Sequence, residues 1–307
     1  MSTTKRPIRG VLPVFQTPYH PDYAIDFTTL EREIQWLFAQ GADGIVMGMV
    51  SETLRLSGDE RKAVAEAVCR YTRTHGNGES VTIISAGAES THTAVDYARH
   101  AEQVGADGVM VIPPVSVAVG EEELYRYYAT IIEAINIPVV VQDASGYVGR
   151  PMSIAMQAAL YNTYGDRVLF KPEATPIGPR LSALRDATDG RAPILEGTGG
   201  IALVDSYRRG IVGTMPGADL IDVIVALWQA LEADDEELIY QLSLPLSSLI
   251  AIQNSLDAFL AVEKYLLVQR GIFQNELVRG PVGYTLDPET RAEIDRLFAQ
   301  LQQKIRS

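Results

Sequence analysis

Residues 81–114 read VTIISAGAESTHTAVDYARHAEQVGADGVMVIPP, and the pattern of this stretch indicates how the whole chain folds. It begins with the apolar, β-branched run 81–87, continues into an amphipathic segment that ends at Gly105, and closes with a second apolar run, 108–114. Near-continuous apolar strands are what a parallel sheet covered on both faces requires, and helices commonly end at a glycine. The stretch therefore predicts a strand, a helix and a second strand parallel to the first.

The same alternation continues from this stretch towards both ends of the chain. Eight strands that alternate with helices favour a closed (β/α)8 barrel over an open doubly wound sheet, and no GxGxxG opens a helix after the first run. We predict an α/β protein with a TIM barrel over residues 1–220 and a C-terminal helical extension over 221–307, packed on the barrel as one structural domain. The other apolar runs are GVLPVF (10–15), GIVMGMV (44–50), IPVVVQD (137–143), VLFKPE (168–173), APILEG (192–197) and IVGTMPG (211–217).

Composition argues against several classes of protein. The 307 residues carry a formal net charge of −13, which argues against nucleic acid as a partner because phosphate binding needs a basic face. Cys69 is the only cysteine, which excludes an internal disulfide, and the four histidines show no metal-binding spacing, so no metal is expected. No apolar run is long enough to span a membrane, and the N-terminus lacks an apolar leader. We therefore expect a cytoplasmic protein without a membrane partner.

In a barrel of this kind the active site lies at the carboxyl ends of the strands, which selects four short segments. They are residues 48–52 (GMVSE), 142–143 (QD), 171–173 (KPE) and 197–200 (GTGG). Lys171 follows an apolar strand, so its ammonium group would be buried, which favours the neutral amine that attacks a carbonyl. Two non-catalytic interpretations fit the same pattern: the amine of Lys171 could reach solvent at the strand end, or it could form a structural ion pair with Glu173.

Glu173 lies two residues after Lys171, and residues i and i+2 of a regular strand point to the same face. If Lys171 points into the barrel mouth, Glu173 is expected there too, where burial raises the pKa of a carboxyl group and suits it for proton transfer. Two other outcomes stay open. Glu173 could only keep Lys171 protonated, or Pro172 could form a bulge that breaks the parity.

Long segments of the chain resemble one known family. They are GVLPVFQTPYHPDYAIDFTTL (10–30), GADGIVMGMVSETLRLSGDER (41–61), GADGVMVIPP (105–114), FKPEA (170–174) and AVEKYLLVQRGIFQNELVRGPVG (261–283). They are similar to the dihydrodipicolinate synthase/N-acetylneuraminate lyase superfamily of class I aldolases, and the likeness places Lys171 at the family's Schiff-base lysine. It implies a 2-keto acid as the small-molecule substrate, no metal or cofactor, and a homotetramer.

The chain departs from this family where proton transfer takes place. The family usually has Gly-Thr-Thr-Gly-Glu at 48–52, Thr-Pro-Tyr-Tyr at 112–115 and Tyr-Asn at 142–143, whereas this chain has GMVSE, IPPV and Gln142-Asp143. The threonine hydroxyls and both tyrosines of the family's relay are therefore missing. In the family an acidic residue usually follows the lysine directly. Here Pro172 lies between them, so Glu173 is expected on the same face of the strand as the lysine.

These departures favour dehydration over retro-aldol cleavage. Cleavage requires removal of the C4 hydroxyl proton, and Gln142 cannot remove it because an amide side chain does not titrate. In dehydration a base removes the C3 proton beside the Schiff base and then protonates the leaving C4 hydroxyl; Glu173 is the candidate, with Gln142 orienting that hydroxyl or its water. Within the resemblance we expect a hydro-lyase that converts L-2-keto-3-deoxyarabonate to 2-oxoglutarate semialdehyde, as in L-arabinose degradation.

Two segments are predicted to bind this substrate. Backbone N–H groups at 49–51, with one serine hydroxyl, would hold the carboxylate if the family's backbone geometry is retained. The segment 197–199 would let the sugar-acid tail approach the backbone, or would form only a tight turn. The family's tail pattern, with Lys264, Arg279 and Pro281, and the residue Glu52 are predicted to be structural. The predicted binding residues are Met49, Val50, Ser51, Gly197, Thr198 and Gly199.

Other functions also fit the sequence. A pyruvate-forming aldolase could use Glu173 or an ordered water in place of the tyrosine. A decarboxylating dehydratase of a six-carbon diacid would favour a cationic group for the second carboxylate, and no candidate is evident. A barrel that binds a 2-keto acid without catalysis, as a sensor or an assembly subunit, is compatible with the lost relay. The retained Lys171 counts against this last function.

Overall fold

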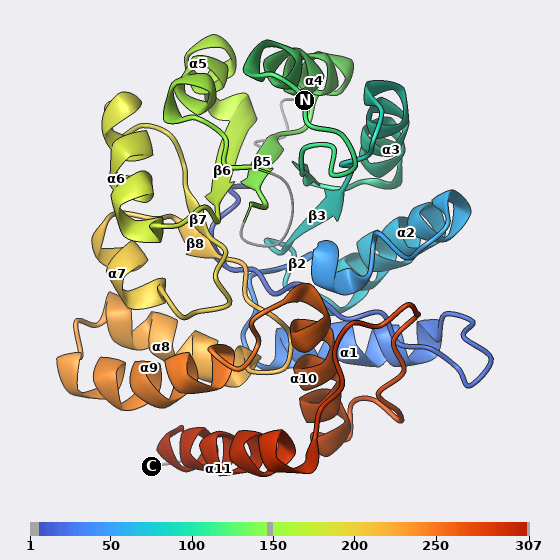
Figure 1. Ribbon diagram of the computed structural model, residues 1–307, viewed down its shortest axis with the longest axis vertical. Helices are drawn as coiled ribbons and strands as arrows, with labels where there is room; N and C mark the ends of the chain where they lie inside the picture. Colours follow the sequence, from blue (N-terminus) through green and yellow to red (C-terminus); the bar gives the residue numbers. More distant parts are fainter. Residues whose placement is uncertain (1–5, 146–149, 306–307) are drawn as a thin grey trace.

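The computed structural model describes residues 6–145 and 150–305, in which strands and helices alternate around a central barrel (Figure 1). Residues 1–5, part of the segment predicted to lack an apolar leader, lie outside the described residues. Each strand falls inside one of the predicted apolar runs. The strands are β1 (Gly10–Val11), β2 (Gly44–Val46), β3 (Val81–Ser85), β4 (Gly108–Val111), β5 (Val139–Asp143), β6 (Val168–Pro172), β7 (Leu195–Glu196) and β8 (Gly213–Thr214).

The strands pair in parallel and close into a barrel. Strands β2 to β6 pair in chain order, and β8 lies between β7 and β1. Two single bridges join these groups: Val14 pairs with Val46, the last residue of β2, and Phe170 of β6 pairs with Ile194 before β7. The predicted (β/α)8 barrel is therefore confirmed.

Helices cover the outside of the barrel. The helix of the eighth unit is α8, so the division predicted at residue 220 falls between β8 and its own helix. Two short 3-10 helices, η1 (Met49–Ser51) and η2 (Gly165–Arg167), lie after β2 and before β6. The ring consists of α1 (Phe27–Ala39), α2 (Gly58–His75), α3 (Thr91–Val104), α4 (Glu121–Ala134), α5 (Ile154–Tyr164), α6 (Ile177–Ala187), α7 (Leu203–Arg208) and α8 (Ile221–Glu232).

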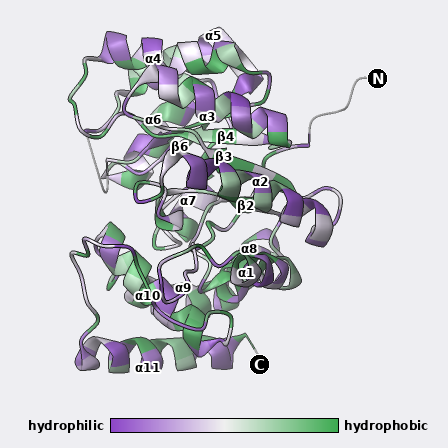
Figure 2. Ribbon diagram, turned by 90° about the vertical axis from the view of Figure 1, so that its right-hand side faces the viewer, coloured by the Kyte–Doolittle hydropathy of each residue, from purple (hydrophilic) through white to green (hydrophobic). Residues whose placement is uncertain are grey.

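Three further helices follow the alternation, as the sequence predicts: α9 (Glu236–Ile250), α10 (Leu256–Gln269) and α11 (Pro288–Lys304). Helix α9 packs on α8 and α11, and α10 contacts η1 at the barrel mouth. Figure 2 shows α9, α10 and α11 as a group beside the barrel, with polar and apolar residues alternating along α11. Within the described residues, no helix combines the length and the apolar character needed to cross a membrane.

The stretch 81–114 folds as predicted, into β3, α3 and β4. The Ser90 hydroxyl accepts a hydrogen bond from Thr93 N at 3.2 Å and so caps the first turn of α3. Gly105 ends the helix with φ of 90°, a left-handed conformation that favours glycine. The chain then returns in parallel, with Ile83 of β3 paired with Gly108 of β4.

Two apolar cores lie on either side of the strands. One core fills the barrel and includes Val46, Val140, Leu169 and Leu195. The other lies between the strands and the helices and includes Phe170, the neighbour of Leu169. The strands thus alternate inward and outward side chains, which decides which residues reach the barrel mouth.

Candidate active site

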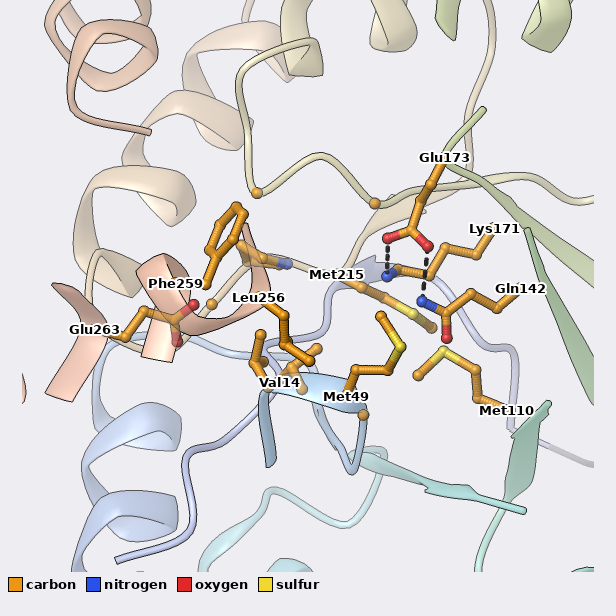
Figure 3. Close-up of a pocket in the computed structure, with 16 residues that line it drawn as sticks. Val14, Met49, Met110, Gln142, Lys171, Glu173, Met215, Leu256, Phe259 and Glu263 are labelled. Atoms are coloured by element: carbon orange, nitrogen blue, oxygen red, sulfur yellow. Dashed lines mark hydrogen bonds and ion pairs between the residues drawn. The ribbon is translucent and has the colours of Figure 1, made fainter. Parts of the chain in front are cut away.

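The alternation of side chains continues past the strand ends and forms a pocket at the barrel mouth (Figure 3). Leu169 faces the barrel interior, and two and four residues later Lys171 and Glu173 line the pocket. Val140 also faces inward, and Gln142 lines the pocket in the same way. The carboxyl ends of the strands therefore deliver the three predicted catalytic side chains to one place.

These three side chains form a buried hydrogen-bonded cluster. Lys171 Nζ donates to Glu173 Oε1 at 2.8 Å, and Gln142 Nε2 donates to Glu173 Oε2 at 2.7 Å. Lys171 and Glu173 are each 5% exposed. The β5–β6 register runs without interruption to the pairing of Asp143 with Pro172. The predicted position of Glu173 on the lysine's face is thus confirmed, whereas the catalytic roles of all three residues stay predictions.

The electrostatics of this cluster favour proton exchange at Glu173. Burial raises the pKa of the Glu173 carboxyl above its ordinary value, and the charge of nearby Glu196 adds to this shift. The charge of Lys171 and hydrogen bonds from Lys171 and Gln142 oppose the shift. A carboxyl group held between these opposing effects can act as an acid or as a base.

The side-chain oxygen of Gln142 has no hydrogen-bond partner among the described residues. This oxygen, Oε1, is buried, whereas the amide nitrogen is occupied by Glu173. Buried polar atoms are nearly always hydrogen-bonded, so an unpaired acceptor in a pocket is a feature that a ligand or water would satisfy. Gln142 can therefore hold Glu173 in place and accept a hydrogen bond from a substrate hydroxyl at the same time.

Two of the three η1 residues line the pocket, but the serine of this turn does not. Met49 and Val50 line the pocket, whereas Ser51 does not. The Ser51 hydroxyl donates to Phe15 O at 2.6 Å, and Ser51 N donates to Gly48 O at 3.0 Å. A hydroxyl has a single proton, so that of Ser51 is already committed to the Phe15 carbonyl.

A buried ion pair anchors this turn to the C-terminal helices. Lys264 Nζ of α10 is fully buried, pairs with Glu52, and donates to Thr17 O at 2.8 Å and Leu277 O at 2.6 Å. Glu52 adopts φ of 58° and also accepts a hydrogen bond from Arg279 N at 3.1 Å. Glu52 and Lys264 thus have the structural part that the sequence predicts.

In the segment after β7, too, some of the predicted binding residues line the pocket and one does not. Gly197 and Gly199 line the pocket, but Thr198 does not. The Thr198 hydroxyl and backbone N–H both contact the carboxylate of Glu196, and Ala202 N donates to Thr198 Oγ1 at 3.0 Å. Thr198 therefore orders the turn, which presents the two glycines to the pocket.

Gly197 leaves room for the reactive side chains, which leads to a prediction. A Cβ at this position would lie 2.7 Å from Lys171 Cε and 3.0 Å from Glu173 Cγ, so one of these side chains must move. We expect Gly197→Ala to lower kcat/KM by about 100-fold, because misplacement of a reacting group by about 1 Å has an effect of this size.

The matched control for this prediction is Gly120→Ala, because a Cβ at Gly120 would meet no atom within 4 Å. Steady-state kinetics measure the effect, and thermal unfolding shows whether each variant is folded. A folded Gly197→Ala enzyme with wild-type kcat/KM would contradict this account of the glycine.

The remaining pocket wall was not predicted from the sequence. Apolar side chains of Val14, Met110 and Met215 come from the barrel, and Leu256, Phe259 and Glu263 come from α10. Sequence reasoning missed α10 because it lies outside the β/α alternation. The signal was present in its sequence, where Glu263 and Lys264 interrupt an otherwise apolar helical segment.

Two kinds of group are missing from this pocket. Among the described residues, no group of three or more histidine, cysteine, aspartate or glutamate side chains is placed to hold a metal ion. The described residues that line the pocket include no tyrosine. Among the described lining residues, the groups that can exchange a proton are therefore Lys171, Glu173 and Glu263.

The fold and the site together define a barrel lyase class with a buried lysine at the end of the sixth strand. The chain matches the dihydrodipicolinate synthetase family over residues 7–301 and belongs to that family. It is thus a lyase of the dihydrodipicolinate synthase/N-acetylneuraminate lyase superfamily, as the sequence resemblance implies.

Relatives of this chain are named as enzymes that catalyse different reactions. L-2-keto-3-deoxyarabonate dehydratase of Azospirillum brasilense is 29% identical over 297 residues, which cover 93% of this chain and 92% of the relative. 4-Hydroxy-tetrahydrodipicolinate synthase of Rhizobium meliloti is 27% identical over 94% of this chain and 96% of the relative. The crystal structure of dihydrodipicolinate synthase from Rhodopseudomonas palustris superposes with a TM-score of 0.84 at 27% identity, over 95% of this chain and 97% of that one.

Proposed function

We propose that this protein is a Schiff-base-dependent dehydratase of a 2-keto-3-deoxy sugar acid, with L-2-keto-3-deoxyarabonate as substrate and 2-oxoglutarate semialdehyde as product. The observation that supports it most directly is the cluster in which Glu173 accepts hydrogen bonds from both Lys171 and Gln142. A further argument is the similarity to the A. brasilense dehydratase over most of both chains. The homotetramer and the cytoplasmic location that the resemblance implies stay predictions.

In the proposed reaction Lys171 attacks the C2 carbonyl, and loss of water gives the imine. The imine acidifies C3, and the Glu173 carboxylate removes a C3 proton to give the enamine. Protonated Glu173 then donates to the C4 hydroxyl, which leaves as water, while Gln142 Oε1 accepts a hydrogen bond from that hydroxyl. Hydrolysis of the imine and tautomerisation at C5 give the aldehyde, so the net change is loss of one water.

The proposal places the substrate carboxylate at η1. The first N–H groups of a helix lack intrahelical partners, and Met49 and Val50, the first two residues of η1, line the pocket. Ser51 has no part in this proposal, because its hydroxyl donates to Phe15 O and its N–H donates to Gly48 O. Gly197 and Gly199 would face the remainder of the substrate.

Product analysis with L-2-keto-3-deoxyarabonate tests the function. We expect 2-oxoglutarate semialdehyde and no pyruvate, because the described pocket lining provides a carboxyl group for elimination but no tyrosine for cleavage. Pyruvate as the product would overturn dehydration in favour of an aldolase. Neither product, together with no borohydride-trapped adduct at Lys171, would favour a barrel that binds 2-keto acids without catalysis.

A further inference from the structure

The pocket has a fourth polar side chain, to which the proposed reaction assigns no part. Of the described residues that line the pocket, only Gln142, Lys171, Glu173 and Glu263 have polar side chains. The first three form the cluster on β5 and β6, whereas Glu263 comes from α10 and lies across the pocket from Lys171 (Figure 3). Between them the wall consists of valine, leucine, methionine, phenylalanine, proline and glycine.

Glu263 is held firmly in this position. Its side chain is 1% exposed, and Gln16 Nε2 donates to Glu263 Oε2 at 2.6 Å. The backbone of Ala218 supplies a further hydrogen bond. Gly217 leaves space for the carboxyl group, since a Cβ at this glycine would lie 2.5 Å from Glu263 Oε1. The chain thus has a glycine at the point where any side chain would displace this carboxyl group.

The surroundings of Glu263 are rich in hydrogen-bond acceptors. Gln16 N donates to Glu33 Oε1 at 2.9 Å, and the carboxyl groups of Glu33 and Asp219 both lie near Glu263. Gln16 Oε1, Glu33 Oε2 and Asp219 Oδ2 are buried and have no hydrogen-bond partner among the described residues. Burial and the charge of Asp219 raise the pKa of Glu263 well above its ordinary value. This part of the wall therefore suits a hydroxyl group, which both donates and accepts hydrogen bonds and can pair with a carboxyl group in either protonation state.

The cationic side chains near Glu263 already form ion pairs with other carboxylates. Lys264 pairs with Glu52, and Arg270 pairs with Asp222. Neither of them lines the pocket. A substrate with a second carboxylate would meet Glu263 without a cation at this part of the wall to pair with, and desolvation of an unpaired charge is costly.

We propose that Glu263 recognises the terminal hydroxyl of the substrate and is the residue that selects a neutral, hydroxylated tail over an apolar or an anionic one. This inference rests on the proposed function and names the residue that determines its specificity. Lys171, Glu173 and Gln142 act at C2 to C4, and Glu263 binds the hydroxyl on C5. Glu263 takes no part in imine formation, because it lies away from the lysine.

Two substrates that differ by one oxygen test this proposal. They are L-2-keto-3-deoxyarabonate and its 5-deoxy analogue, 4-hydroxy-2-oxopentanoate of the same C4 configuration. For the wild type we expect kcat/KM to be about tenfold or more higher for the hydroxylated substrate, since one net hydrogen bond has an effect of this size. In Glu263→Met this ratio should fall to about one, mainly through a higher KM for the hydroxylated substrate. Glu263→Gln, which retains hydrogen-bonding groups, should restore most of the ratio.

Borohydride trapping with pyruvate separates this inference from the proposed function. Pyruvate has no tail, so wild type, Glu263→Met and Glu263→Gln should all be trapped to the same extent at Lys171. A wild-type ratio near one, or an undiminished ratio in a Glu263→Met enzyme that is trapped normally, would overturn the role of Glu263 and leave the dehydratase intact. If the wild type dehydrates neither substrate, the proposed function fails and this inference falls with it.

Discussion

Replacement of Lys171 by methionine is expected to abolish turnover, with a loss in kcat on the order of 10⁶, as follows removal of a covalent nucleophile from a protease. Methionine keeps the unbranched shape of the side chain but has no amine to form the imine. Glu173 would lose one partner and keep Gln142, which donates to it at 2.7 Å. Because burial already raises the pKa of Glu173, a proton can replace the lost lysine, and the fold is expected to persist.

Mass spectrometry after borohydride reduction with pyruvate checks this result. The wild type should gain one reduced pyruvate on Lys171, and Lys171→Met should gain none. Lys62→Met is the matched control, because Lys62 forms only a surface ion pair with Asp96 at 2.7 Å. Lys264 should stay unlabelled, since its ammonium group is fully buried and hydrogen-bonded to three acceptors. An adduct on Lys171→Met would mean that another lysine forms the imine.

Glu173→Gln is expected to lower kcat by about 10² to 10⁴, the range for removal of a general acid or base. The glutamine is nearly isosteric, so Lys171 should still form the imine, and pyruvate trapping should persist. Proton transfer at C3 and C4 should fail, because an amide does not titrate. The loss therefore falls on the step after imine formation.

The pH profile distinguishes this role from a structural one. The base must be ionised, and burial raises the pKa of Glu173 above its ordinary value of 4.5. Wild-type kcat should therefore fall as the pH drops through this raised pKa, and the acidic limb should be lost in Glu173→Gln. Glu66→Gln, at an exposed position of α2, is the control. Wild-type turnover in a Glu173→Gln enzyme that still traps pyruvate would show that Glu173 is not the base.

The positions of the reactive side chains could be predicted because they follow from strand periodicity. Leu169, Lys171 and Glu173 share one face of the chain, and Lys171 Nζ lies 2.8 Å from Glu173 Oε1. The barrel itself could be predicted for the same reason, since each apolar run contains one strand. Periodicity is a local property, so a single sequence contains all of this information.

The parts that were missed depend on contacts between distant segments. Ser51 has a polar side chain in a promising segment, but its hydroxyl turns to Phe15 O, 36 residues away in the chain. Glu263 is 247 residues from Gln16, which donates to it. The importance of Gly197 lies in the space that Lys171 occupies. None of these contacts follows from the spacing of residues along the chain.

The pocket is made by two parts of the chain that can change independently. The strand ends provide the groups that form and break bonds in the proposed reaction, while Leu256, Phe259 and Glu263 of α10 form the opposite wall. If the proposed function holds, mutations in α10 are expected to alter which keto acid enters while imine formation is preserved, provided that Lys264 continues to hold Glu52. In such an enzyme we expect new substrate specificities to evolve first through changes in α10, while the residues at the strand ends stay unchanged.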